Sequence, residues 1–135
     1  MKNFDVQGID LNVSRRQAWA FIADPVQLPR WTNAFASVTP GHAVLRTPGG
    51  EVLADLEVDA SPEQGTIDWR ITFPDRSVAT AFSRVVAVDP ERCIFSFVLT
   101  PPPVPLEKLE GALEAQSRTL AEELEKLKRI LENHG

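Results

Sequence analysis

The fold of this chain is decided by residues 105–133, PLEKLEGALEAQSRTLAEELEKLKRILEN, which read as one long amphipathic helix. Leucine recurs at every seventh position from Leu106 to Leu127, and other apolar residues follow three or four places later, so one apolar stripe runs at helical spacing. At about 1.5 Å per residue such a helix spans roughly 40 Å. We therefore expect a wide apolar surface beneath it, and the candidate is a sheet built from the strand-rich middle of the chain.

Near its midpoint the sequence around the apolar stripe reads Gly111, Ala112, Ala115, Gln116 and Ser117, so large apolar side chains are sparse there for about two turns. Small residues such as Gly111 and Ala115 are typical of close contact between a helix and a sheet, and equally of a hollow that would hold a ligand. The leucine spacing also resembles a short coiled coil. Gln116 and Glu123, however, occupy positions that a two-stranded seam would fill with apolar residues.

Composition limits the classes of protein that are possible. The 135 residues are most simply one domain, spanning 1–135, and the formal net charge of −5 argues against a nucleic-acid partner. No apolar run approaches the ~20 residues of a membrane span, and the N-terminus lacks a signal-peptide core, so we expect a cytoplasmic protein. Cys93 is the single cysteine and His134 is one of two histidines, so we expect neither a metal site nor a cofactor.

Before the long helix the chain reads as a strand, two short helices and a run of about six antiparallel strands. Residues 4–13 alternate as a strand, with a change of phase at Gly8 that indicates a β-bulge. Ser14 and Gln17 form a capping box, and Asp24-Pro25 opens the second short helix. An antiparallel sheet with one polar face must cover its apolar face, which predicts an α+β fold with the terminal helix as the cover.

This order, with residues 13–32, VSRRQAWAFIADPVQLPRWT, and the closing leucine helix, resembles the START-like or Bet v1-like (SRPBCC) superfamily. The resemblance is strongest to its bacterial polyketide cyclase/dehydrase and lipid-transport branch. It implies a helix-grip fold, in which a curved antiparallel sheet wraps around a long C-terminal helix and two short helices follow strand 1. It also implies a largely apolar cavity that binds lipids, sterols or polyketides, and some members cyclise or dehydrate their ligands. The chain contains no tyrosine, and no set of catalytic residues carries over by motif.

Aromatic side chains are the candidates for the wall of that cavity, although aromatic residues at strand spacing are also typical of an ordinary core. Trp31 is favoured, because the Asp-Pro break places it where the short helices meet the mouth of the cavity. The full set of candidate ligand-binding residues is Trp31, Phe35, Trp69, Phe82, Phe97, Gly111 and Ala115.

Two residues are candidates for chemistry. Arg84 shares a strand face with Phe82, and a buried arginine would need an anionic partner, either a ligand carboxylate or enolate or a protein carboxylate. If that face points to solvent, Arg84 lies outside the cavity. His42, beside Gly41, is either an acid or base at the cavity mouth or an exposed loop histidine.

We expect from these observations a domain that binds a small hydrophobic or amphiphilic molecule. One alternative is a polyketide cyclase or dehydratase in which Arg84 or His42 steadies an enolate. A pocket with two or more convergent ionisable groups would favour that enzyme. Another alternative is a protein-interaction module resembling the Hsp90-activator relatives, or a homodimer joined through the sheet, because both faces of residues 77–88 are largely apolar.

Overall fold

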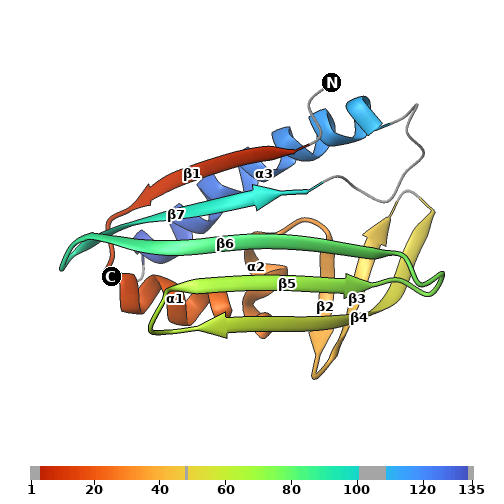
Figure 1. Ribbon diagram of the computed structural model, residues 1–135, viewed down its shortest axis with the longest axis horizontal. Coiled ribbons are helices and arrows are strands. Elements are labelled where there is room, and N and C mark those ends of the chain that lie inside the picture. The colour runs from red at the N-terminus through yellow and green to blue at the C-terminus, as the bar shows by residue number, and fades with distance from the viewer. Residues whose placement is uncertain (1–3, 48, 101–108, 134–135) are drawn as a thin grey trace.

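The computed structural model describes residues 4–47, 49–100 and 109–133. They form an antiparallel sheet of seven strands, a long C-terminal helix and short helices after the first strand (Figure 1). The elements are β1 (Asp5–Leu11), α1 (Arg15–Ala23), the 3-10 turn η1 (Pro25–Gln27), α2 (Leu28–Trp31), β2 (Phe35–Thr39), β3 (His42–Thr47), β4 (Gly50–Ser61), β5 (Thr66–Thr72), β6 (Val78–Asp89), β7 (Arg92–Leu99) and α3 (Leu109–Asn133). The expected α+β helix-grip fold is confirmed.

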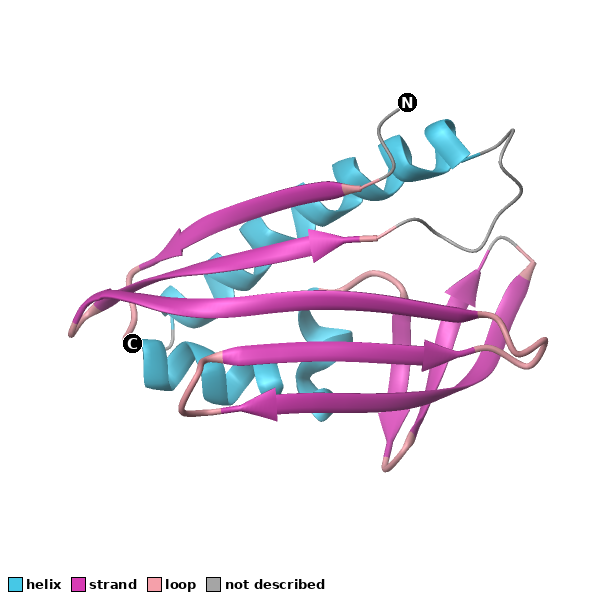
Figure 2. Ribbon diagram, viewed as in Figure 1, coloured by secondary structure: helices cyan, strands magenta, loops and turns pink. Residues whose placement is uncertain are grey.

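The strands follow the order β1-β7-β6-β5-β4-β3-β2, and every neighbouring pair is antiparallel. The first strand therefore pairs with the last, with Asp5 opposite Leu99 and Leu11 opposite Cys93. Figure 2 shows β2 and β3 turned steeply against the direction of β5 and β6. This curvature leaves a concave face, which the helices cover.

The predicted β-bulge at Gly8 is wrong. Pairing between β1 and β7 runs without a shift from Asp5 to Leu11. The change of phase has another cause: Phe4 and Val6 are 50% and 54% exposed on the outer side of the sheet, whereas Leu11 is buried on the inner side. An apolar residue on the solvent face imitates a bulge in sequence, because alternation by itself does not say which face is buried.

The predicted caps of the short helices are present. The Ser14 hydroxyl accepts a hydrogen bond from the Gln17 backbone N–H at 3.1 Å, and the Asp24 carboxylate accepts one from Val26 N–H at 3.2 Å. Arg15 then fastens α1 to the turn between β4 and β5, where its Nη2 donates to the carbonyl oxygens of Pro62 at 3.0 Å and Glu63 at 2.9 Å. The entry to α1 is thus held to the sheet by the side chain of its own first residue.

Helix α3 buries its apolar stripe against its own chain. The buried leucines that join the main core are Leu120, Leu124, Leu127 and Leu131. Burying one leucine fully stabilises a fold by roughly 1.5–3 kcal/mol, so this stripe is a large part of what holds α3 in place. Leu106 of the predicted stripe lies outside the described residues.

The last turns of α3 are also tied to the end of β1. Lys128 Nζ donates to the Asp10 carbonyl oxygen at 2.7 Å and lies 2.7 Å from Glu132 Oε2, which in turn accepts from Asn12 N–H at 2.9 Å. Near the middle of α3 the link to β1 is different: Gln7 Nε2 donates to the Ser117 carbonyl oxygen at 2.8 Å. A polar side chain therefore spans the distance between strand and helix where the leucines are absent.

Candidate ligand-binding site

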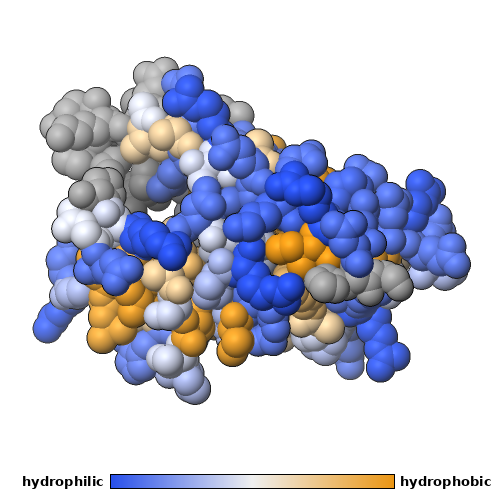
Figure 3. Space-filling model, turned by 180° about the vertical axis from the view of Figure 1, so that it is seen from behind, coloured by the Kyte–Doolittle hydropathy of each residue, from blue (hydrophilic) through white to orange (hydrophobic). Residues whose placement is uncertain are grey.

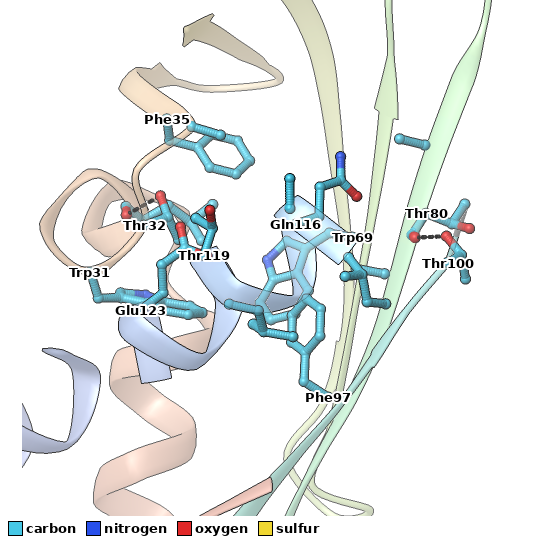
Figure 4. A pocket seen from close by; sticks show the side chains of 17 residues that line it. Trp31, Thr32, Phe35, Trp69, Thr80, Phe97, Thr100, Gln116, Thr119 and Glu123 are labelled. Atoms are coloured by element: carbon cyan, nitrogen blue, oxygen red, sulfur yellow. Dashed lines mark hydrogen bonds between the residues drawn. The ribbon is translucent and has the colours of Figure 1, made fainter. Parts of the chain in front are cut away.

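A cavity of about 340 Å³ lies between α3 and the inner face of the sheet (Figure 4). This volume is at the lower end of the range for small-molecule sites. Helix α3 contributes Ala115, Gln116, Thr119, Leu120 and Glu123 to its lining. The sheet contributes Trp69 from β5, Ala79, Thr80 and Ala81 from β6, and Phe97 and Leu99 from β7, with Thr100 beside them. The remaining wall comes from α2 and the segment into β2, through Leu28, Trp31, Thr32, Ala34 and Phe35.

Small side chains on facing elements keep this space open. The cavity is lined by Ala115 of α3 and by Ala79 and Ala81 of β6, and these short side chains do not fill the space between the helix and the strand. Figure 3 shows the helix side of the molecule, where the outer surface of α3 is hydrophilic and hydrophobic side chains gather over the end of the sheet formed by β2, β3 and β4. The hollow therefore lies beneath a helix whose other face is suited to water.

The cavity wall includes a contiguous group of aromatic rings. Trp31 and Trp69 have ring centroids 6.5 Å apart, and Trp69 stacks on Phe97 at 5.7 Å with an interplanar angle of 28°. Phe95 contacts both Trp31 and Phe97 edge to face, at 6.2 Å in each case. Such offset and edge-to-face contacts stabilise one arrangement of the rings, so the wall is preorganised rather than adaptable.

Two hydrogen-bond donors in this wall have no partner among the described residues. They are the indole nitrogens of Trp31 and Trp69. Trp31 is 2% exposed and Trp69 is 5% exposed. By contrast, Trp19 Nε1 donates to the Thr66 carbonyl oxygen at 3.3 Å. Leaving a buried donor unpaired costs on the order of 1–3 kcal/mol, which makes both positions places where a ligand oxygen would be favourable.

Glu123 brings a carboxyl group to the same cavity. Its Oε2 accepts a hydrogen bond of 2.6 Å from the Asn33 backbone N–H, and burial raises the pKa of this carboxyl even though the hydrogen bond from Asn33 and the charge of Lys126 act to lower the pKa. Figure 4 shows Glu123 near Trp31, and the amide group of Gln116 turned away from the Trp69 ring. The hydroxyl of Thr32 does not add a free group, because it donates to the Leu28 carbonyl oxygen at 2.7 Å.

The sequence interpretation did not select Glu123 as a site residue, although a signal was present. Glu123 lies three residues after Leu120 and four before Leu127, and both of these leucines are buried. An acidic residue at that spacing lies on the apolar stripe of the helix rather than on its polar face.

The structure places five of the seven predicted ligand-binding residues in the cavity lining: Trp31, Phe35, Trp69, Phe97 and Ala115. Phe82 instead lies on the outer face of the sheet and is 44% exposed. Gly111 belongs to α3 but not to the lining, and a Cβ added there would meet no atom within 4 Å. The part of α3 that lines the hollow thus begins about one turn after Gly111 and ends at Glu123.

Both predicted chemical residues lie outside the cavity. Arg84 is exposed on the outer face of β6, where its Nε donates to the Gln64 carbonyl oxygen at 3.3 Å. His42 is exposed at the start of β3, with Nδ1 3.2 Å from Asp55 Oδ1. Arg84 does share a face with Phe82, and the burial of Ser83 and Val85 shows that this face is the outer one, which is the alternative that places Arg84 outside the cavity.

Two further findings concern the described part of the chain. Residues 4–47, 49–100 and 109–133 bring no three His, Cys, Asp or Glu side chains together as a metal site would require. Within the same ranges, no helix combines the length and the apolar character needed to cross a membrane.

A curved antiparallel sheet that grips a long C-terminal helix over an apolar cavity is the architecture of START-like helix-grip domains, and this chain is one of them. It belongs to the polyketide cyclase/dehydrase and lipid transport family, whose model matches residues 4–132. None of the curated proteins matches the chain in sequence.

Solved structures resemble the fold at low sequence identity. A START superfamily protein from Mycobacterium smegmatis has a TM-score of 0.71 at 12% identity, over 99% of this chain and 100% of that one. The protein XoxI from Bacillus cereus has a TM-score of 0.70 at 16% identity, over 96% of each chain. The Zhui aromatase/cyclase from Streptomyces sp. R1128 has a TM-score of 0.66 at 13% identity, over 96% of this chain and 93% of that one. At these identities the likeness is one of fold.

Proposed function

We propose that this chain, as one domain, binds a small hydrophobic or amphiphilic molecule of lipid-like or polyketide-like character in the cavity between α3 and the sheet. The observation that carries the proposal is the lining itself, which combines a preorganised aromatic wall with two unpaired indole donors and one carboxyl group. An aromatic wall with a few polar groups is typical of small-molecule sites. The family to which the chain belongs includes lipid transport in its description, which is consistent with this proposal.

A cyclase or dehydratase is the second candidate. One specific observation favours it: Glu123 lines the cavity, and burial raises the pKa of its carboxyl, as general acids require. A neighbour in fold is described as an aromatase/cyclase. However, Glu123 is the one ionisable side chain among the described lining residues, whereas acid–base chemistry at two positions of a polyketide would need at least a pair. Binding is therefore the better-supported function.

A protein-interaction module or a homodimer is the third candidate. The outer face of the sheet exposes Val78, Phe82, Val86, Val88 and Ile94. Exposed apolar residues on one face of a sheet favour an interaction site when they form a large patch. Light scattering coupled to size-exclusion chromatography at micromolar concentration tests the homodimer, and a mass of one chain, 14.9 kDa, would contradict it.

Intrinsic fluorescence offers a direct test of the binding proposal. The chain contains three tryptophans, and two of them, Trp31 and Trp69, line the cavity. In the variant Trp19→Phe, all tryptophan emission comes from the cavity wall. Molecules extracted from the purified protein and identified by mass spectrometry, and in parallel 1-decanol, are titrated into this variant. We expect a saturable change in emission, and the absence of any saturable change together with an empty extract contradicts the proposal.

A further inference from the structure

The polar groups of the cavity restrict which functional group a ligand can carry, which its apolar lining does not. Trp31 and Trp69 present indole N–H groups, which only donate hydrogen bonds. Glu123 presents a carboxyl group whose Oε2 is used by Asn33 N–H, while its Oε1 has no partner among the described residues. When ionised, that carboxyl group only accepts. A matching ligand must therefore offer an acceptor to the indoles and a donor to Glu123.

A hydroxyl group is the simplest group that meets both requirements, because it carries one donor and two acceptor lone pairs. A keto or ester oxygen can accept hydrogen bonds from the indole N–H groups, but it has no hydrogen to donate to the carboxylate of Glu123. An ammonium group can donate to the carboxylate of Glu123, but it has no acceptor for the indole N–H groups. The apolar remainder of such a ligand would lie against the stacked rings of Trp69 and Phe97.

Charge excludes a further class of ligand. The described lining residues include no lysine or arginine, so a ligand carboxylate would enter the cavity without a counter-charge and close to Glu123. An unpaired charge moved from water into an apolar site is strongly disfavoured, and a like charge beside it adds to the cost. The charged neighbours that act on Glu123 are Lys126 and Glu122, and because they have opposite signs their two charges together give no net positive charge.

We infer that the cavity selects an uncharged, hydroxyl-bearing apolar molecule, an alcohol or a phenol, over the corresponding carboxylate, and that Glu123 is the residue that determines this specificity. The inference rests on the proposed function, because it names the ligand class of the same cavity. It differs from that function in predicting a rank order among ligands of equal size.

The test uses four probes that share one bicyclic skeleton: 2-naphthol, methyl 2-naphthoate, 2-naphthoate and 2-naphthylmethylammonium. Isothermal titration calorimetry at pH 8 measures the dissociation constant of each for the wild-type chain, Glu123→Gln and Glu125→Gln. Glu123→Gln removes the charge but keeps a side-chain oxygen that can accept from Asn33 N–H. Glu125→Gln removes the same charge from an exposed position two residues away that is not among the charged neighbours of Glu123, and is the matched control.

We expect the wild-type chain to bind 2-naphthol at least tenfold more tightly than 2-naphthoate, with the ester between them. We expect Glu123→Gln to reduce that ratio to threefold or less, mainly through tighter binding of 2-naphthoate, and Glu125→Gln to leave the ratio as in the wild type. The wild-type ratio tests the inference even if Glu123→Gln fails to fold.

The possible failures are distinguishable. If no probe binds the wild-type chain, the proposed function and this inference both fail. If the probes bind but 2-naphthoate is as tight as 2-naphthol, or if Glu123→Gln folds and leaves the ratio unchanged, the inference is overturned while the binding function stands. Tightest binding of 2-naphthylmethylammonium also overturns it, since the carboxyl would then select a cation.

Discussion

Glu123 of α3 accepts a hydrogen bond from the backbone N–H of Asn33, with 2.6 Å between Oε2 and the nitrogen. The two residues are 90 positions apart in sequence, and their contact joins the long helix to the loop between α2 and β2. Because both α2 and Glu123 line the cavity, this single bond connects two of its walls. The contact also holds a carboxyl group where burial disfavours its charge.

The stability of the fold should therefore depend on pH through Glu123. Burial raises the pKa of this carboxyl, so its contribution to stability is fully present below the pKa of an unfolded glutamate, about 4.3, and is lost as pH rises through the raised pKa. We expect Glu123→Gln to become more stable relative to the wild type as pH increases from 4 to 8. Urea unfolding at each pH measures this, with Glu125→Gln as the control. A relative stability that falls with pH would contradict the prediction.

The opposite dependence is expected for Glu132 at the other end of α3. Hydrogen bonds from Lys128 and from Asn12 N–H lower the pKa of its carboxyl. Its contribution is then present above the unfolded pKa and is lost as pH falls through the lowered value. Glu132→Gln should flatten the decrease in stability of the wild-type chain below about pH 4.3, as measured by thermal unfolding between pH 2 and pH 6. An unchanged acid profile would show that the contact with Lys128 contributes nothing measurable.

Filling the cavity from the helix side should abolish binding without unfolding the protein. Ala115→Leu adds a larger side chain at an exposed position that lines the cavity, so we expect at least a tenfold loss of affinity for 2-naphthol and a change in unfolding free energy of at most about 0.5 kcal/mol. Ala121→Leu makes the same change at an exposed position of α3 outside the lining and should leave affinity unchanged. Equal effects of the two variants would show that the cavity is not the binding site.

Gly65 is required where the turn between β4 and β5 meets β6. Its φ is +74°, and a Cβ there would meet the Val85 carbonyl oxygen and the Arg15 guanidinium. We expect Gly65→Ala to reduce the unfolding free energy by about 2–4 kcal/mol, from backbone strain and from the steric clash together. Gly41 has a similar φ of +77° but no atom within 4 Å, so Gly41→Ala should cost only about 1–2 kcal/mol. Chemical denaturation compares the two, and equal losses would rule out the clash as the cause.

The outer face of the sheet should contribute nothing to ligand binding. Arg84→Ala and His42→Ala both remove a side chain that lies outside the cavity lining, and we expect each to change the affinity for 2-naphthol by less than about twofold and stability by no more than about 0.5 kcal/mol. Calorimetric titration of both variants checks this. A tenfold loss in either would revive the interpretation in which these residues hold the ligand.

Much of the fold follows from local patterns. The leucine spacing of residues 105–133 and the pairing of Ser14 with Gln17 depend on neighbours a few positions apart, and both produce the expected structure in the described residues. Trp31 was placed near the cavity by the Asp-Pro break, again a local feature. The Gly8 bulge was wrong because exposed Val6 made the alternation ambiguous.

The sequence by itself determined the helix, the strands and the family, because their signals are periodicities and caps that the backbone satisfies within one element. Only the tertiary structure decided which face of β6 points inward, since both faces are largely apolar and the choice depends on pairing with β5 and β7. That choice turned Phe82 and Arg84 outward and brought Ala79 and Ala81 to the cavity. Packing of α3 then carried Glu123 against Asn33 and beside the two tryptophans, a contact between distant segments that no local pattern specifies.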